Sequence, residues 1–186
     1  MTRLSPLFAL AAAALATSPT FAADAGRFTL TSTDVAEGKQ MANEQVLNGF
    51  GCMGGNVSPA LQWTAPPAGT KSLTLQVYDP DAPTGSGWWH WVVVDIPANA
   101  RALPKGAGKS GVQIAGGARQ THTDFGTSGY GGPCPPPGKP HRYIFTLSAL
   151  DIDKLPVPDD ASGALVGFNV GAHTLAKATI TAMYGR

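Results

Sequence analysis

Two strand-like segments joined by a proline-containing turn constrain the fold more than any other part of the chain. In the first segment, apolar residues alternate with polar ones over 73–77, which predicts a half-buried strand whose inner face also includes Asp79. Pro80 and Pro83 supply no N–H group, so the chain must leave the strand and turn there. The pattern therefore predicts a carboxylate at the inner end of a strand.

The second segment begins near Trp89 and runs to Asp95. By simple alternation, His90 shares a face with Val92 and Val94, and the other face is also apolar. We expect His90 to point inward and to lie near Asp79. Polar residues at inward positions on neighbouring strand ends are typical of the floor of a pocket.

A pair of inward polar residues follows a loop rich in glycine and proline, from Tyr130 to Pro140, which is too poor in N–H groups to pair as a strand. In the strand that this loop precedes, His141 and Tyr143 share a face with Phe145. We expect both polar side chains to point inward as well.

The remaining chain is divided into short elements, because its 23 glycines and 16 prolines are spread between strand-like segments. This distribution predicts a mostly β protein with long ordered loops. Further strands are expected from Phe28, over 61–63 and over 178–184. A short helix, capped within 160–162, is expected to run to about Leu175.

Residues 1–22 have the features of an export signal: Arg3 precedes an apolar run too short to span a bilayer, and Thr20 and Ala22 are small residues that suit a signal peptidase. Residues 23–186 then form a single domain. We expect a periplasmic or secreted protein with no integral membrane segment in its mature part.

The charge of the chain is nearly balanced, with a formal net charge of +1 and 13% charged residues. No Lys/Arg cluster is present to neutralise phosphates, so we expect no nucleic-acid partner. The sequence indicates no cofactor.

The only two cysteines, Cys52 and Cys134, lie in separate glycine-rich loops. An even cysteine count in an exported chain favours a disulfide between them. Two buried thiols are the alternative. A cysteine metal site is disfavoured because neither residue has a second Cys or His at ligand spacing.

Several motifs in order resemble one family. They are Asp-Pro-Asp-Ala-Pro at 79–83, Trp-His at 89–90, Tyr-Gly-Gly-Pro-Cys-Pro-Pro at 130–136 and His-Arg-Tyr at 141–143. Together they are similar to the phosphatidylethanolamine-binding protein family, in particular its bacterial branch of YbhB, YbcL and Raf kinase inhibitor-like proteins and, with the export signal, the periplasmic YbcL type. The resemblance extends from Phe28 to Tyr184.

The resemblance implies an antiparallel β-sandwich with one or two short helices, one of them near the C-terminus, and a small anion pocket at one end. In the family this pocket takes phosphate, acetate or phosphoryl-ethanolamine head groups. Carried onto this chain, the ligand-binding set is Asp79, Asp81, Pro83, His90, Pro133, Cys134, Pro135, His141 and Tyr143. Cys134 departs from the glycine of eukaryotic members, so the disulfide would tether this loop.

A carboxylate beside an anion is unfavourable unless it holds a protonated histidine. Asp79 could do so with His90 or His141, and the Tyr143 hydroxyl and the N–H groups of the glycine-rich loop would add donors. Anion affinity would then rise below roughly pH 6.5, the reference value for histidine.

Other interpretations remain open. The Asp and His residues could hold a divalent metal, or Asp79 and His90 could serve a hydrolase, although no Gly-x-Ser-x-Gly motif is present. The two histidines could also be structural. A non-enzymatic binding protein is favoured, and the alternative from another class is a protein-interaction or inhibitor module directed at a protease or host protein. A homodimer is also open.

Overall fold

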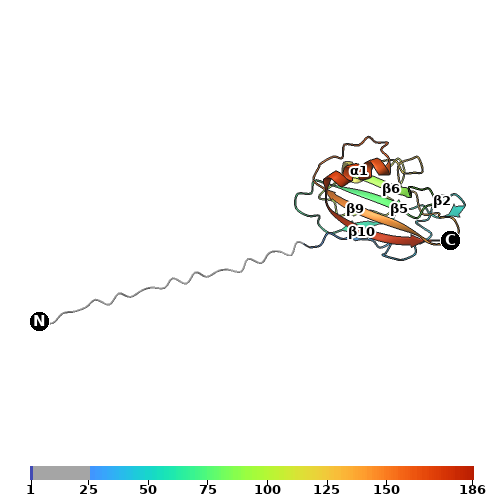
Figure 1. Cartoon of the computed structure of the whole chain (residues 1–186), viewed down its shortest axis with the longest axis horizontal. Coiled ribbons are helices and arrows are strands. Elements are labelled where there is room, and N and C mark those ends of the chain that lie inside the picture. Colours follow the sequence, from blue (N-terminus) through green and yellow to red (C-terminus); the bar gives the residue numbers. More distant parts are fainter. Residues whose placement is uncertain (2–25) are drawn as a thin grey trace.

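The structure is a computed structural model that describes Met1 and residues 26–186 (Figure 1). Apart from Met1, the signal peptide predicted over residues 1–22 lies outside this part. Within it, none of the helices combines the length and the apolar character that a membrane span requires.

A five-stranded antiparallel sheet forms the centre of the molecule, in the order β10-β9-β5-β6-β8. Its strands are β5 (Ser72–Asp79), β6 (Trp88–Pro97), β8 (Arg119–Gln120), β9 (His141–Leu150) and β10 (Thr174–Tyr184). The three long strands predicted from alternation and the closing strand are confirmed. The closing strand starts at Thr174, earlier than expected, because it pairs with β9 along nearly its whole length.

Two smaller antiparallel sheets complete the β structure. One contains β1 (Leu30–Thr31), β4 (Leu61–Trp63) and β7 (Ala102–Leu103), and the other is the hairpin of β2 (Asn48–Gly49) and β3 (Cys52–Met53). The strand over 61–63 matches its prediction. The first strand begins at Leu30 rather than at Phe28.

The three-stranded sheet packs on one face of the large sheet. Leu61 and Trp63 from β4 join a buried cluster with Leu75 of β5, Trp91 of β6 and Phe145 of β9. A fully buried side chain of this size stabilises the fold by about 1.5–3 kcal/mol relative to exposure. This packing is the antiparallel sandwich that the resemblance implied.

The opposite face of the large sheet is covered by α1 (Gly163–His173) and the segment before it (Figure 1). The Ser162 hydroxyl caps the helix by accepting the N–H of Leu165 at 3.2 Å. Val166 and Val170 of the helix pack on Val92 and Val94 of β6 in a second buried cluster. The predicted helix near the C-terminus is therefore confirmed, ending at His173.

The prediction that β5 is half-buried is wrong, because α1 and the segment before it cover its second face. Ser72 and Gln76 on that face are buried. The Ser72 hydroxyl donates to the carbonyl of Ile152 at 2.6 Å, and the Gln76 amide donates to the carbonyl of Gly163 at 3.1 Å. These hydrogen bonds allow polar side chains to lie inside the protein.

A β-bulge in β6 changes the face on which His90 lies. Val77 pairs with Trp91 and Tyr78 pairs with Trp89, so His90 is the extra residue between them. The prediction that His90 shares a face with Val92 and Val94 is therefore wrong. His90 instead points to the side of β5 that carries Val77, toward Tyr143 of β9.

Candidate functional site

The inward polar residues gather at one end of the large sheet. β5 ends at Asp79 and β9 begins at His141, and the two strands are antiparallel neighbours. The same end of the molecule carries the β2–β3 hairpin and the C-terminus (Figure 1). Strand direction and register therefore bring together side chains that lie 62 positions apart.

Asp79, which is buried, forms a pair with His141, which is partly buried. Nδ1 of His141 lies 2.8 Å from Oδ2 of Asp79, while Oδ1 of Asp79 accepts the backbone N–H of Asp81 at 2.8 Å. Since the carboxylate accepts, the His141 Nδ1 is the donor, and Nε2 is the nitrogen left for other partners. The pair thus orients an imidazole whose second nitrogen carries no hydrogen bond within residues 26–186.

His90 is buried behind this pair. Its Nδ1 donates to the carbonyl of Gly131 at 2.7 Å. Burial lowers the pKa of the imidazole below its ordinary value of 6.5, because the charged form loses its hydration. At neutral pH His90 is therefore uncharged, and its Nε2 is a hydrogen-bond acceptor.

Tyr143 lies against His90, with the two ring centres 5.0 Å apart and the rings nearly perpendicular. Burial, and then the charge of Asp79, raise the pKa of the Tyr143 hydroxyl above its ordinary value of 10. The hydroxyl keeps its proton at the floor of the site, where the Asp79 carboxylate is one acceptor within reach.

These residues line a cavity of about 160 Å³. Seven of the nine predicted ligand-binding residues lie in its walls. They are Asp79, Pro83, His90, Cys134, Pro135, His141 and Tyr143. The structure thus brings together residues from two strand ends, a bulge and two loops.

Asp81 and Pro133 lie outside the cavity wall. Asp81 forms a two-pronged ion pair with Arg142, with nitrogen–oxygen distances of 2.9 and 2.7 Å. The hydrogen bonds from Arg142 lower the pKa of Asp81 to about 2. Pro133 is buried, and its carbonyl accepts the N–H of Leu47 at 3.1 Å. Both residues fasten the loops around the cavity.

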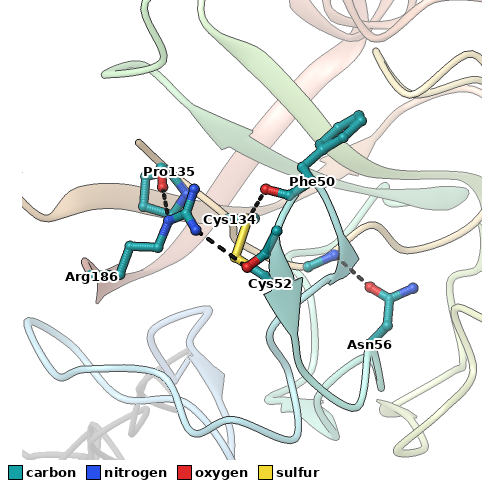
Figure 2. Close-up of a disulfide and its surroundings, with 8 residues drawn as sticks. Phe50, Cys52, Asn56, Cys134, Pro135 and Arg186 are labelled. Atoms are coloured by element: carbon teal, nitrogen blue, oxygen red, sulfur yellow. Dashed lines mark hydrogen bonds between the residues drawn. A yellow bond between two sulfur atoms is a disulfide. The ribbon is translucent and has the colours of Figure 1, made fainter. Parts of the chain in front are cut away.

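The predicted disulfide between Cys52 and Cys134 is present and joins the β2–β3 hairpin to the glycine- and proline-rich loop (Figure 2). The two cysteines are 82 positions apart, and closing a loop of this length stabilises a fold by up to roughly 4–5 kcal/mol in the chain-entropy model. Arg186 adds to the tether, since its Nε donates to the carbonyl of Pro135 at 2.6 Å. The wall formed by this loop is therefore held from two sides.

The N–H groups of Gly131 and Gly132, expected as donors to a ligand, are engaged elsewhere. Gly131 donates to the carbonyl of His90 at 2.8 Å, and Gly132 donates to the side chain of Asn56 at 2.7 Å. Pro135 has no N–H group. Along this wall, only the N–H of Cys134 has no hydrogen-bond partner among the described residues.

Sequence reasoning missed most of the apolar wall. The cavity is also lined by Leu47, Phe50, Ala82, Thr84, Trp88, Phe125 and Pro136. Trp88 lies in this wall, whereas its neighbour Trp89 packs on Tyr78, with ring centres 4.4 Å apart. The only sequence signal for the two phenylalanines is their position next to glycines in the Gly-Phe-Gly and Asp-Phe-Gly loops.

The described residues around the site form no cluster of metal ligands. Among residues 26–186, no group of three or more His, Cys, Asp and Glu side chains is placed to hold an ion. His141 and Asp79 are paired with each other, and His90 turns its Nδ1 to a backbone carbonyl. The floor of the site therefore contains one carboxylate, two imidazoles and a phenol. The walls above this floor are mostly apolar.

Comparison with known proteins agrees with this architecture. The family model of phosphatidylethanolamine-binding proteins matches residues 31–185. The protein YbhB of Escherichia coli is 56% identical over 155 residues, which cover 83% of this chain and 98% of YbhB.

YbcL of Escherichia coli is 52% identical over 167 residues, covering 89% of this chain and 91% of YbcL. Its crystal structure, described as that of a new member of the mammalian PEBP family, superposes with a TM-score of 0.83 over 86% of this chain and 98% of that chain, at 51% identity.

A protein of Mycobacterium tuberculosis named as a lipoprotein, LppC, is 39% identical over 115 residues, covering 61% of this chain and 53% of LppC. The fold, the order of the motifs and the matches over nearly the whole described chain lead to one conclusion: the chain belongs to the phosphatidylethanolamine-binding protein family.

Proposed function

We propose that the protein is a non-enzymatic binding protein of the periplasm or another exported compartment, and that its cavity takes a small anion or the phosphorylated head group of a larger molecule. The observation that carries this proposal is the Asp79–His141 pair, in which both residues line the cavity and the imidazole keeps one nitrogen without a partner among the described residues. The disulfide and the lipoprotein relative support export.

Asp79 favours an anion complex through His141. In the complex, a protonated His141 donates from Nε2 to the anion, while Asp79 accepts from Nδ1 and stabilises the cation. The Tyr143 hydroxyl and the Cys134 N–H are further donors in the wall. The carboxylate, which also lines the cavity, thus acts on the ligand through the imidazole.

His90 sets the direction of the pH dependence. Because burial lowers its pKa, His90 is an acceptor at neutral pH and becomes a second cationic donor only in more acidic solution. We therefore expect affinity for a fully ionised anion to rise as the pH falls below 6.5.

The size of the cavity favours a small ligand. A drug-sized ligand occupies a pocket of roughly 300–1,000 Å³, whereas this cavity has a volume of about 160 Å³. A phosphate, an acetate or a phosphoethanolamine group suits the smaller space, and the rest of a larger molecule would extend past the mouth.

A thermal-shift titration tests the proposal. The disulfide-intact protein is titrated with phosphate, phosphoethanolamine, acetate and zinc, in the parent and in His141→Ala. A ligand that binds only the folded state raises Tm by mass action. We expect a phosphoryl compound to stabilise the parent and to have little effect on the variant.

His173→Ala is a matched control. Its Nδ1 lies 2.9 Å from Asp151, a pair of the same kind as His141 with Asp79, but on the exposed end of α1. This variant should keep the full ligand-induced rise in Tm. If no anion shifts Tm at millimolar concentration, or if both variants lose the shift equally, the proposed function is wrong.

A second candidate, a protein-interaction or inhibitor module, is favoured by the outer face of α1. Leu165 and Phe168 are exposed there, Phe168 by 80%, and Leu175 is exposed just after the helix. Large exposed apolar groups that lie close together mark interaction sites. If Phe168→Asp abolishes a cellular activity and His141→Ala does not, this second function replaces the first.

A further inference from the structure

The turn between β2 and β3 carries a large aromatic residue where the backbone disfavours it. Phe50 and Gly51 connect the two strands, and both have positive φ angles, 52° and 82°. Two-residue turns of this kind favour Asn or Gly, because a side chain with a Cβ is strained there. The Phe50 side chain is also 71% exposed. Neither the backbone nor burial accounts for a phenylalanine at this position.

The hairpin holds this ring over the cavity. Cys52, two residues after Phe50, is bonded to Cys134 of the opposite wall. The sulfur of Cys134 lies 3.5 Å from the carbonyl oxygen of Phe50, and a guanidinium N–H of Arg186 donates to the carbonyl of Gly51 at 3.4 Å (Figure 2). Phe50 is therefore presented from a fastened turn and lines the mouth.

Phe50 completes a continuous aromatic wall. Its ring stacks on Phe125, with centres 5.9 Å apart and planes 22° from parallel. Phe125 in turn meets Trp88 edge to face at 5.4 Å and His90 at 5.5 Å. Aromatic groups thus run from the polar floor at His90 to the solvent-exposed ring of Phe50.

We propose that Phe50 is a specificity-determining residue and that the preferred ligand is an organic anion carrying a flat, aromatic substituent. This inference rests on the proposed function, since the anionic group would occupy the floor at His141 and Tyr143. A bare inorganic anion keeps its outer oxygens against walls that cannot hydrogen-bond to them. An aromatic substituent instead packs on Phe125 and on the open edge or face of Phe50.

Paired probes separate the anionic group from its substituent. Dissociation constants are measured by isothermal titration calorimetry for inorganic phosphate against phenyl phosphate and for acetate against benzoate. In the parent we expect each aromatic probe to bind about tenfold more tightly than its bare anion. The comparison of phosphate with acetate shows which anionic group the floor prefers.

Two substitutions of Phe50 isolate its ring. Phe50→Gly removes the side chain and relieves the positive φ, so Tm should be unchanged or higher while the aromatic preference falls to about threefold or less. Phe50→Leu keeps an apolar side chain and should give an intermediate preference. Met53→Ala, on the same hairpin and 88% exposed but outside the cavity wall, is the matched control and should behave as the parent does.

The outcomes distinguish this inference from the proposed function. If bare anions bind the parent in a His141-dependent way but phenyl phosphate and benzoate bind no more tightly, the inference is wrong and the proposed function stands. The inference is also overturned if Phe50→Gly weakens bare and aromatic anions equally, because Phe50 would then only shape the hairpin. If no anion binds the parent, both fail.

Discussion

Two buried aspartates at strand ends differ in what their partners can still do. Asp79 ends β5 and Asp95 lies near the end of β6, and both are nearly inaccessible to solvent. Both carboxylates accept one backbone N–H and one charged or chargeable side chain. Asp79 has His141 as its partner, and Asp95 has Arg119.

The partner of Asp95 is fully engaged by the protein. Arg119 donates to Asp95 at 2.7 Å, to Asp159 at 2.6 Å and to the carbonyl of Val157 at 3.2 Å. The second oxygen of Asp95 accepts the N–H of Leu155 at 2.8 Å. This network fastens the segment before α1 to the large sheet and borders no part of the cavity.

The partner of Asp79, in contrast, keeps one nitrogen free at the wall of a cavity. Burial of a carboxylate therefore does not by itself identify a binding site. What identifies one is a partner with a hydrogen-bonding position left over, next to space for a ligand. The comparison predicts that Asp95 contributes to stability alone and that Asp79 contributes to binding.

Replacement of Asp95 should have the largest effect on stability. Asp95→Ala leaves Arg119 partly buried without its buried partner and places alanine at a φ of 60°, so we expect a loss of about 3–5 kcal/mol in the free energy of unfolding. Urea denaturation measures the loss. Asp95→Asn, which tolerates positive φ, should lose less. Phosphate affinity of the folded variants should remain that of the parent, and a weakened affinity would break the comparison.

Replacement of Asp79 should have a smaller effect on stability and a larger one on binding. Asp79→Asn removes a hydrogen bond to a charged acceptor, which lowers the free energy of unfolding by about 2 kcal/mol. Because the neutral amide no longer stabilises a protonated His141, phosphate should bind at least about tenfold more weakly, a change of about 1.4 kcal/mol. Calorimetry that finds unchanged affinity would make Asp79 a structural residue like Asp95.

Much of this site follows from the strand period in the sequence. Alternation places Asp79 with Leu75, and Tyr143 with Phe145, on the inner face. The antiparallel pairing of β5 with β9 then brings the end of β5 next to the start of β9. The disulfide was predictable from the even cysteine count together with the expectation of export.

Features that depend on distant parts of the chain could not be predicted. No residue near His90 signals the bulge, because its register is set by pairing with β5. From the sequence, Gln76 resembles an exposed residue. It is buried because the carbonyl of Gly163, 87 positions later, accepts a hydrogen bond from its amide. Asp81 resembles Asp79 in its sequence context, but its carboxylate pairs with Arg142 and does not line the cavity. Phe50 reaches the cavity only through a hairpin held by the disulfide.

The dependence of stability on pH should report the burial of His90 beside the Asp79–His141 pair. Since burial lowers the pKa of His90 below 6.5, the unfolded chain binds this proton more readily than the folded one. The stability contribution is complete above pH 6.5 and is lost as the pH falls toward the folded pKa. Urea denaturation between pH 7.5 and 5 should show this decline. His90→Asn, which keeps a donor for the Gly131 carbonyl, should flatten it, and an unaltered slope would exclude His90 as the titrating group.

A third aspartate, Asp81, should give the smallest effect. Arg142→Ala removes a largely exposed ion pair, so we expect a loss of less than about 1 kcal/mol and no change in phosphate affinity. The pKa of Asp81 should rise from about 2 toward its ordinary value of 3.8, as observed by carboxyl-carbon NMR. The stability contribution of this pair is present above the ordinary value and is lost as the pH falls toward 2. A large loss of phosphate affinity would show that Asp81 contacts the ligand after all.

Proton uptake on anion binding tests the central role of the Asp79–His141 pair most directly. Acetate is fully ionised at pH 7, so any proton taken up on binding goes to the protein. Calorimetric titrations in two buffers with different ionisation enthalpies measure this uptake. The account predicts a net uptake by the parent and its loss in His141→Ala, with His173→Ala unchanged. Acetate binding without proton uptake, or uptake that persists in His141→Ala, would contradict it.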